Sequence, residues 1–194
     1  MPSFTTHTVA TAPASSRPLL AQIEAAWGFL PNLHAVLAES PEALEGYHRL
    51  FGLAGATGFT PAEQQLAFLV FSVFHGCAYC TMGHTWLARQ AGLDEASVQA
   101  LRSGGTLADP RLEALRAFAL RLAGTRGQVG SDALASFLDA GFERRHVLDL
   151  LVILAAKVIS NYADHIAGTP REAFMHDPAL AWSADRAAVG GHVE

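Results

Sequence analysis

The stretch TPAEQQLAFLVFSVFHGCAYCTMGHTWLARQA, residues 60–91, predicts two consecutive helices with a break between them. Thr60, Pro61 and Glu63 have the form of a capping box, in which Thr60 is the N-cap, Pro61 stands at N1 and Glu63 at N3. The run that follows, through Phe74, is apolar. We therefore expect two helices in direct succession, with the CxxC pair at the start of the second, which is expected to be a core helix.

The second helical pattern carries the only two cysteines of the chain. Gly76 lets the chain bend, so we expect Cys77 at or near a helix N-terminus, where free amide groups and the helix dipole lower the pKa of a thiol. Cys80 lies one turn further and His84 another turn on, so the three side chains share one helix face. Two thiols placed in this way can oxidise to a disulfide and be reduced again, with the imidazole as proton acceptor.

The rest of the chain also reads as helix, and no stretch combines sustained period-two alternation with hairpin turns. The predicted fold class is therefore all-α, with a helical domain over 15–178, an extended N-terminal arm over 1–14 and a C-terminal tail over 179–194. Arm and tail could clasp a neighbouring subunit. Outside 60–91, helices are expected over residues 18–28, 31–39, 41–54, 94–102, from 110 onward, 131–140 and 143–167.

Composition narrows the classes of function. The chain of 194 residues has 51% hydrophobic and 16% charged residues, too few charges to cover a monomer, so part of the apolar surplus is expected between subunits. A net charge of −5 without Lys/Arg clusters argues against nucleic acid or an anionic membrane as partner. The N-terminus has no signal-peptide pattern, and the longest apolar runs, 66–74 and 150–156, are shorter than a bilayer requires. A cytoplasmic location follows as the expectation, and there a CxxC pair is redox-active or metal-binding more often than a structural disulfide.

Two other interpretations of the cysteine pair stay open at this point. His75, Cys77, Cys80 and His84 could supply four metal ligands, although structural zinc sites usually combine two separated pairs. The thiols could also be inert members of the core. In the redox interpretation a thiolate attacks the O–O bond of a peroxide, forms a sulfenic acid, and condenses with the second thiol to a disulfide.

Several segments together resemble the carboxymuconolactone decarboxylase family, and within it the AhpD-like alkylhydroperoxidases and "peroxidase-related" proteins. The resemblance covers roughly residues 15–170. It is carried by the central motif at residues 60–67, 76–80 and 84–85, and by flanking segments at 28–33, 40–44 and 161–167. The branch that gives the family its name is a poorer match, because it works without a CxxC pair.

The resemblance implies an AhpD-like helical bundle, a homo-oligomer (trimer or hexamer) and a peroxidase that needs no cofactor. It implies that Cys80 is the peroxidatic cysteine, which attacks the peroxide, that Cys77 resolves the intermediate and that His84 relays protons. The implied reductant is a lipoylated or thioredoxin-like dithiol protein. The family's relay also uses a glutamate, and Gln65 stands at its position in this chain.

Gln65 cannot carry a proton as a carboxylate does, but it could orient water or His84 by hydrogen bonding. Glu63 lies on a different helix face, and its capping-box role is favoured over a role as the missing acid. Four more residues are secondary candidates for the site. His75 could favour a thiolate or bond a carbonyl at a helix end, Tyr79 could line a peroxide pocket, and Asn161 and His165 could face the dithiol from the last helix.

Two charged residues of the last predicted helix, Asp149 and Lys157, stand in an apolar pattern. They need partners if they are buried, and they could find them across a subunit interface.

The sequence thus leaves three hypotheses of decreasing weight. The first is a thiol peroxidase that cycles Cys77 and Cys80 between dithiol and disulfide. The second is a non-catalytic redox sensor or binding protein on the same scaffold, with Gln65 marking a lost relay. The third is a small metal-binding module.

Overall fold

The fold is known from a computed structural model, which describes residues 4–184. Within this range there are nine α-helices, two short 3-10 helices and no strand, so the predicted all-α class is confirmed. The elements are α1 (Arg17–Trp27), α2 (Asn32–Leu37), α3 (Pro41–Ala54), α4 (Pro61–Phe74), α5 (Ala78–Gln90), α6 (Glu95–Arg102), α7 (Pro110–Gly124), α8 (Ser131–Asp139), α9 (Arg144–Ala167), η1 (Ala173–His176) and η2 (Pro178–Leu180).

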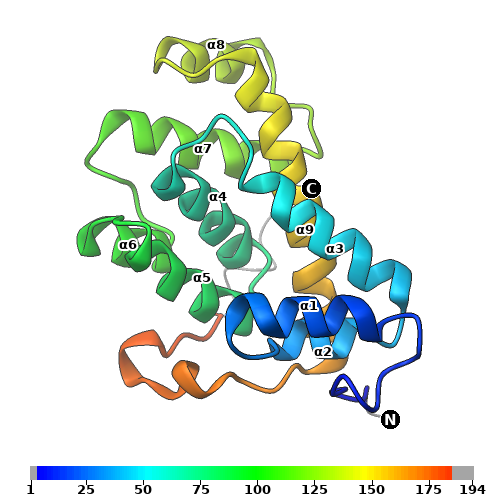
Figure 1. The fold of residues 1–194 in the computed structure, drawn as a ribbon. Coiled ribbons are helices and arrows are strands. Elements are labelled where there is room, and N and C mark those ends of the chain that lie inside the picture. The colour runs from blue at the N-terminus through cyan, green and yellow to red at the C-terminus, as the bar shows by residue number, and fades with distance from the viewer. Residues whose placement is uncertain (1–3, 185–194) are drawn as a thin grey trace.

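Helix α4 is the centre of the bundle. It begins with the expected capping box, in which Thr60 and Glu63 bond each other's backbone N–H, and most of its residues are buried. It packs against α5, α6, α7 and α9. The long α9 packs in turn against α3 (Figure 1). An all-round apolar helix is stable only in such a position, because every face must be removed from water.

The junction between α4 and α5 places the cysteines. His75 is the C-cap of α4, and Gly76 follows with a φ of 69°, in the left-handed region that glycine adopts without strain. Cys77 N then bonds Ser72 O at 3.0 Å, and Cys77 becomes the N-cap of α5. The bend expected at Gly76 is therefore present, and it turns the start of α5 onto the core.

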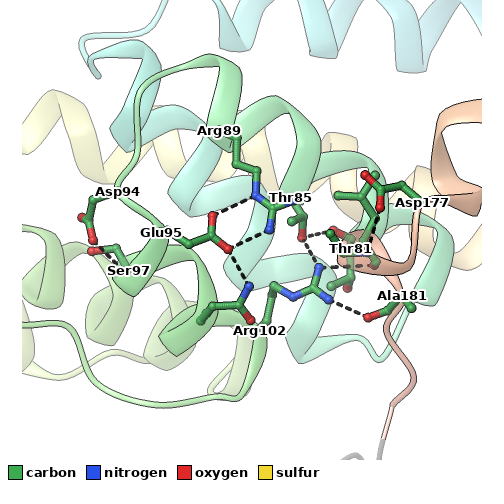
Figure 2. Close-up of polar contacts among 12 residues, drawn as sticks. Thr81, Thr85, Arg89, Asp94, Glu95, Ser97, Arg102, Asp177 and Ala181 are labelled. Atoms are coloured by element: carbon green, nitrogen blue, oxygen red, sulfur yellow. Dashed lines mark hydrogen bonds and ion pairs between the residues drawn. The ribbon is translucent and has the colours of Figure 1, made fainter.

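After α9 the chain returns across the bundle as an irregular segment, 168–184, that the sequence did not predict. Gly168 ends α9 with a φ of 64°, and the two 3-10 helices follow. The Arg102 guanidinium holds the end of this segment, donating to Thr85 Oγ1 at 3.0 Å and to Ala181 O at 2.6 Å (Figure 2). The segment is thus fixed against α5 and α6.

The described part of the N-terminal arm differs from the extended conformation that we expected. The Thr8 and Thr11 side chains bond within a turn, and Ala12 is buried. His7 N donates to Ala35 O at 3.2 Å, so the arm packs on α2 of its own chain. Residues 1–3, and 185–194 of the expected tail, lie outside the described residues.

One described helix, α9, is long and apolar enough by length and composition to cross a membrane, although the separate apolar runs in the sequence are short. In the fold it packs against α2, α3, α4 and α5, which is the environment of a core helix.

Candidate active site at the cysteine pair

Cys77 is fully buried and holds its hydrogen in a defined place. Its thiol donates to Asp164 Oδ2 at 3.2 Å, and its sulfur accepts from Cys80 N, also at 3.2 Å. The interaction with the Cys80 sulfur, burial and the nearby Asp164 carboxylate all raise the pKa of Cys77. We expected the helix N-terminus to lower that pKa. The predicted position is right, but burial and the neighbouring negative charges outweigh the helix dipole.

The thiolate belongs to Cys80 instead. Burial opposes ionisation of this thiol, but the interaction with the Cys77 side chain and the positive charge of Lys157 outweigh it, and the pKa of Cys80 is lowered to about 6. At neutral pH the pair therefore consists of a Cys80 thiolate and a Cys77 thiol. This is the protonation pattern needed for one attacking and one resolving sulfur.

His84 lies beside the pair as a neutral base. Its Nδ1 bonds Gln65 Oε1 at 2.9 Å, and its ring stacks on Phe68 with 4.6 Å between centroids. Because the amide oxygen can only accept, Nδ1 carries the hydrogen and Nε2 is left as an acceptor. Burial, with the Lys157 charge, holds the pKa of His84 well below its usual value. The hydrogen bond suggested between Gln65 and His84 is thus present.

Cys80 and His84 belong to the wall of a cavity of about 80 Å³. The wall is contributed by α1, α2, α3, α5, α9 and the segment after α9, and it is mostly aromatic. Its apolar members are Trp27, Phe29, Pro31, Leu33, Tyr47, Phe51, Tyr79, Gly83, Trp86, Leu87, Phe174 and Met175, and its other polar members are His34, Lys157 and Glu172.

Lys157, Glu172 and His34 are the polar residues of this wall that sequence reasoning did not assign to the site. Lys157 is 1% exposed, and its Nζ has no hydrogen-bond partner among residues 4–184. It lies inside its own chain beside Cys80, and not at a subunit interface as we considered. A signal was available in the sequence, because Lys157 is the only lysine of the chain.

Glu172 is also buried in the wall, and one oxygen of its carboxylate accepts two hydrogen bonds. Its Oε1 accepts from Tyr79 Oη at 2.7 Å and from Asn32 N at 2.6 Å. The Tyr79 hydroxyl also accepts from Leu33 N at 3.3 Å, so Tyr79 both lines the cavity and anchors its rim. Nothing in the local sequence marked Glu172, because it lies in irregular chain.

Comparison with known proteins agrees with this architecture. Residues 41–121, which span α3 to α7 and include both cysteines, match the carboxymuconolactone decarboxylase family. No curated protein matches the chain.

Solved structures extend the likeness to most of the chain. The chain resembles an alkylhydroperoxidase AhpD-core, peroxidase-related protein from Ralstonia eutropha JMP134, with a TM-score of 0.78 and 19% identity over 89% of this chain and 93% of that one. A peroxidase-related protein from Silicibacter sp. TM1040 gives 0.75 and 18%, over 91% and 95%. A variant of the debrominase Bmp8 in complex with 2,3,4-tribromopyrrole gives 0.69 and 19%, over 88% and 91%. The predicted AhpD-like fold is therefore confirmed.

Glu63 lies outside the cavity wall. Its Oε2 accepts from Thr60 N at 2.9 Å, and its Oε1 pairs with the Arg111 guanidinium at 2.8 Å. Burial opposes ionisation, but these partners lower the pKa of Glu63. The capping box favoured for this residue is present, and the geometry does not bring its carboxylate to the dithiol.

Three secondary candidates remain, namely His75, Asn161 and His165: the first two bond each other, and the third lies near Cys77. His75 Nδ1 bonds Asn161 Oδ1 at 2.8 Å, so its partner is a side-chain amide and not the backbone carbonyl that we considered. Burial lowers the pKa of His75, which leaves it neutral beside the pair. His165 does reach the dithiol, because a ring nitrogen, an Asp164 oxygen and Cys77 Sγ lie within 4.8 Å of one another.

The geometry does not assemble the alternative metal set of His75, Cys77, Cys80 and His84. The two histidines bond Asn161 and Gln65 respectively, on different helices. Asp164, the carboxylate nearest Cys77, accepts the hydrogen of its thiol, which is the contact of an acid and its acceptor. Asp149 also finds its partners within the chain, at Gly58 N and Arg145.

Proposed function

We propose that the protein is a thiol-dependent peroxidase that reduces small organic hydroperoxides through a Cys77/Cys80 dithiol–disulfide cycle. One observation carries this proposal: the low-pKa sulfur of Cys80 lies in the wall of an aromatic cavity, while the protonated sulfur of Cys77 lies behind it. An exposed or symmetrical pair would not separate the two tasks. The match of residues 41–121 to the carboxymuconolactone decarboxylase family and the AhpD-like fold support an enzyme of this general kind.

The cycle has three steps. The Cys80 thiolate attacks the terminal oxygen of the hydroperoxide, so that an S–O bond forms, the O–O bond breaks and an alcohol leaves. The Cys77 thiol then attacks the sulfenic sulfur, and water leaves as the disulfide forms. A dithiol protein, lipoylated or thioredoxin-like, reopens the disulfide by exchange. His84 accepts a hydrogen bond from the hydroperoxide hydroxyl through Nε2 and so aims the reacting oxygen at Cys80, and in the second step it relays the proton of the Cys77 thiol to the hydroxide that leaves as water.

The same cavity favours a second candidate reaction. The debrominase Bmp8 has the same fold and was crystallised with a brominated pyrrole, and the aromatic wall beside Cys80 suits a flat halogenated ring. In reductive debromination two thiols are oxidised to the disulfide while the ring exchanges bromine for hydrogen, with bromide and one proton released. A redox sensor on this scaffold would form the disulfide without either turnover.

We also propose that the protein is cytoplasmic, works without a cofactor and forms a homo-oligomer (trimer or hexamer). The oligomer is supported by the large apolar side chains that α9 leaves exposed, namely Leu148, Leu151, Tyr162 and Ile166.

The test is turnover of tert-butyl hydroperoxide and of 2,3,4-tribromopyrrole with a dithiol reductant. Wild-type protein should reduce the hydroperoxide, Cys80→Ser should abolish the reaction, and Cys77→Ser should allow one sulfenic acid per chain but no turnover. Turnover of the pyrrole alone would select debromination. Disulfide formation without turnover of either compound would select the sensor, and unchanged turnover in Cys80→Ser would remove Cys80 from the mechanism.

A further inference from the structure

The reaction proposed above lacks a proton donor. When the Cys80 thiolate breaks the O–O bond, the alcohol departs as a strongly basic alkoxide, which needs a proton as it leaves. The family's relay glutamate is replaced by Gln65, whose amide cannot ionise. The first question is therefore which group in the cavity wall can supply this proton.

The histidines and tyrosines of the wall are poor donors. Burial, with the nearby His48, lowers the pKa of His34 to about 4. Burial also holds the pKa of His84 well below its ordinary value, so both rings are neutral. Burial also raises the pKa of Tyr47 and of Tyr79, and the Tyr79 hydroxyl is already committed to Glu172. Glu172 itself accepts two hydrogen bonds, as a carboxylate does.

Lys157 is the only lysine or arginine among the described residues that line the cavity. It is 1% exposed, and its Nζ makes no hydrogen bond within residues 4–184. A buried ammonium without a counter-ion is strongly unfavourable. The Cys80 thiolate beside it, which Lys157 helps to ionise, provides that counter-charge.

The choice of residue type points the same way. Every other cationic side chain of the Lys and Arg class in this protein is an arginine, and Lys157 is the single lysine. Arginine supplies charge but does not release a proton in proteins, whereas a buried lysine does so readily. The single Lys or Arg position in the cavity wall beside Cys80 is therefore occupied by lysine, the member of that class that can also serve as an acid.

We propose that Lys157 is the general acid of the reaction, protonating the alkoxide that leaves when the Cys80 thiolate attacks a hydroperoxide. This proposal rests on the proposed peroxidase function. The S–O bond forms and the O–O bond breaks, the sulfur is oxidised and the peroxide reduced, and one proton moves from Nζ to the departing oxygen. The products are a sulfenic acid, an alcohol and a neutral amine.

The proton is recovered without an external acid. Disulfide formation releases water and leaves the proton count of Lys157 unchanged. When the dithiol reductant reopens the disulfide it delivers two thiols, and the Cys80 thiol then returns its proton to the Lys157 amine. The thiolate–ammonium pair is thus restored at the end of each cycle.

The experiment separates the charge of Lys157 from its proton. Lys157→Arg keeps the charge but cannot donate, and Lys157→Met removes both. Ser160→Ala, which alters a buried polar side chain of the same helix outside the cavity wall, is the matched control. The Met variant should fold, because replacing a buried charge by an apolar side chain of similar volume is often neutral or stabilising.

Two oxidants with different leaving groups provide the readout. tert-Butyl hydroperoxide releases a strongly basic alkoxide, whereas peracetic acid releases a weakly basic carboxylate that needs no proton. Rate constants for oxidation of Cys80 are compared at a pH where alkylation shows the thiol fully ionised in each variant. Arg and Met variants should lose roughly 100-fold or more with the hydroperoxide and less than about 3-fold with the peracid.

Two further measurements do not depend on turnover. By pH-dependent alkylation, the pKa of Cys80 should stay near about 6 with Arg and rise with Met, whose side chain cannot stabilise the thiolate. Because Lys157 is the only lysine, 15Nζ-lysine labelling gives one signal, which should be that of an ammonium at neutral pH in the reduced protein.

The outcomes are distinct for the two levels of the proposal. Equal losses with both oxidants, or a neutral amine in the reduced protein, would overturn the acid role while leaving the peroxidase function intact. A wild-type protein that reduces neither oxidant would overturn both.

The pH titrations of Cys80 and Lys157 also depend on the other titratable groups around them. These groups are Cys77, His84 and Tyr79 on α5, His75 after α4, His34 on α2, Tyr47 on α3, Asp164 and His165 on α9, and Glu172.

Discussion

The two sulfurs of this protein differ because each has a different neighbour. Cys77 gives its hydrogen to the Asp164 carboxylate, whereas Cys80 lies beside the Lys157 charge. A negative neighbour favours the neutral thiol and a positive neighbour favours the thiolate, and both effects are strong where water is excluded. The position of a cysteine in the motif therefore does not decide which sulfur is ionised.

We predict that Cys77→Ala raises the pKa of Cys80 above about 6, because the thiolate loses the interaction with the Cys77 side chain that stabilises it. The rate of iodoacetamide labelling against pH measures this directly. Cys77→Ser keeps a hydroxyl donor and should give a smaller rise. A curve for the Ala variant that coincides with wild type would contradict the contribution of this contact.

We predict that Gln65→Glu raises the pKa of His84. A carboxylate in place of the amide still accepts from Nδ1, and its charge stabilises the imidazolium. Proton NMR of the His84 ring against pH provides the measurement. Glu63→Gln is the control, since Glu63 pairs with Arg111 away from the cavity and should leave the His84 titration unchanged. An unchanged titration in Gln65→Glu would mean that this hydrogen bond does not form in solution.

At the scale of elements, the turn between α4 and α5 decides where the cysteines lie. Gly76 has a φ of 69° there, and a β-carbon in that conformation costs roughly 1–2 kcal/mol. Without this turn Cys77 would not serve as the N-cap of α5, and Cys80 would not reach the cavity.

We therefore predict that Gly76→Ala lowers the free energy of unfolding by about 1–2 kcal/mol, measured by urea denaturation. Gly46→Ala is the matched control, because Gly46 lies within α3 and a β-carbon there would meet no atom within 4 Å. That change should stabilise the protein by about 0.5–1 kcal/mol, since alanine favours a helix interior. A Gly76→Ala variant as stable as wild type would show that the turn can adopt another conformation.

Helix positions were predictable because the signals for them are local. The capping box at Thr60, the break at Gly76 and the stop at Gly168 each lie within a few residues of the end that they mark. The segment after α9 has no such pattern. Its place depends on contacts with distant elements, among them the bonds from Arg102 to its end and from Asn32 to Glu172, and these contacts are not encoded in neighbouring residues.

At the scale of the whole molecule, α9 presents one face to the dithiol and another to the outside. Leu148, Leu151, Tyr162 and Ile166 are 44–71% exposed, which is unusual for so many large apolar side chains on one helix. Lys157, Asn161 and Asp164 of the same helix lie at the site. A subunit bound to the outer face would therefore be coupled to the chemistry through a single rigid element.

We predict that Leu148→Glu with Ile166→Glu dissociates a homo-oligomer, because two charges would have to be buried in its interface. Light scattering after size-exclusion chromatography gives the mass. Leu53→Glu, at an exposed apolar position on α3, is the control and should leave the assembly intact. A wild-type protein that is already monomeric would refute the expected oligomer.

The sequence identified about half of the site. Cys77, Cys80, His84 and Gln65 lie within two adjacent helices, so their spacing was enough to bring them together. Lys157, Asp164 and Glu172 come from the far end of the chain, and their placement depends on how α9 and the segment after it pack on α5. The sequence indicated only that Lys157 would need a partner if it were buried; its burial and the group that faces it could be known only from the fold.

The cavity is walled by α-helices except at Phe29 and Pro31, between α1 and α2, and where the chain after α9 contributes Glu172, Phe174 and Met175. Those three positions shape the space offered to a substrate, yet α4 and α5 do not need them to form. Evolution can therefore exchange Phe174 and Met175 to admit molecules of another size while the sulfur chemistry is inherited unaltered. Among proteins of this fold, the residues that differ with the substrate should accordingly be concentrated in the segment that corresponds to 168–184.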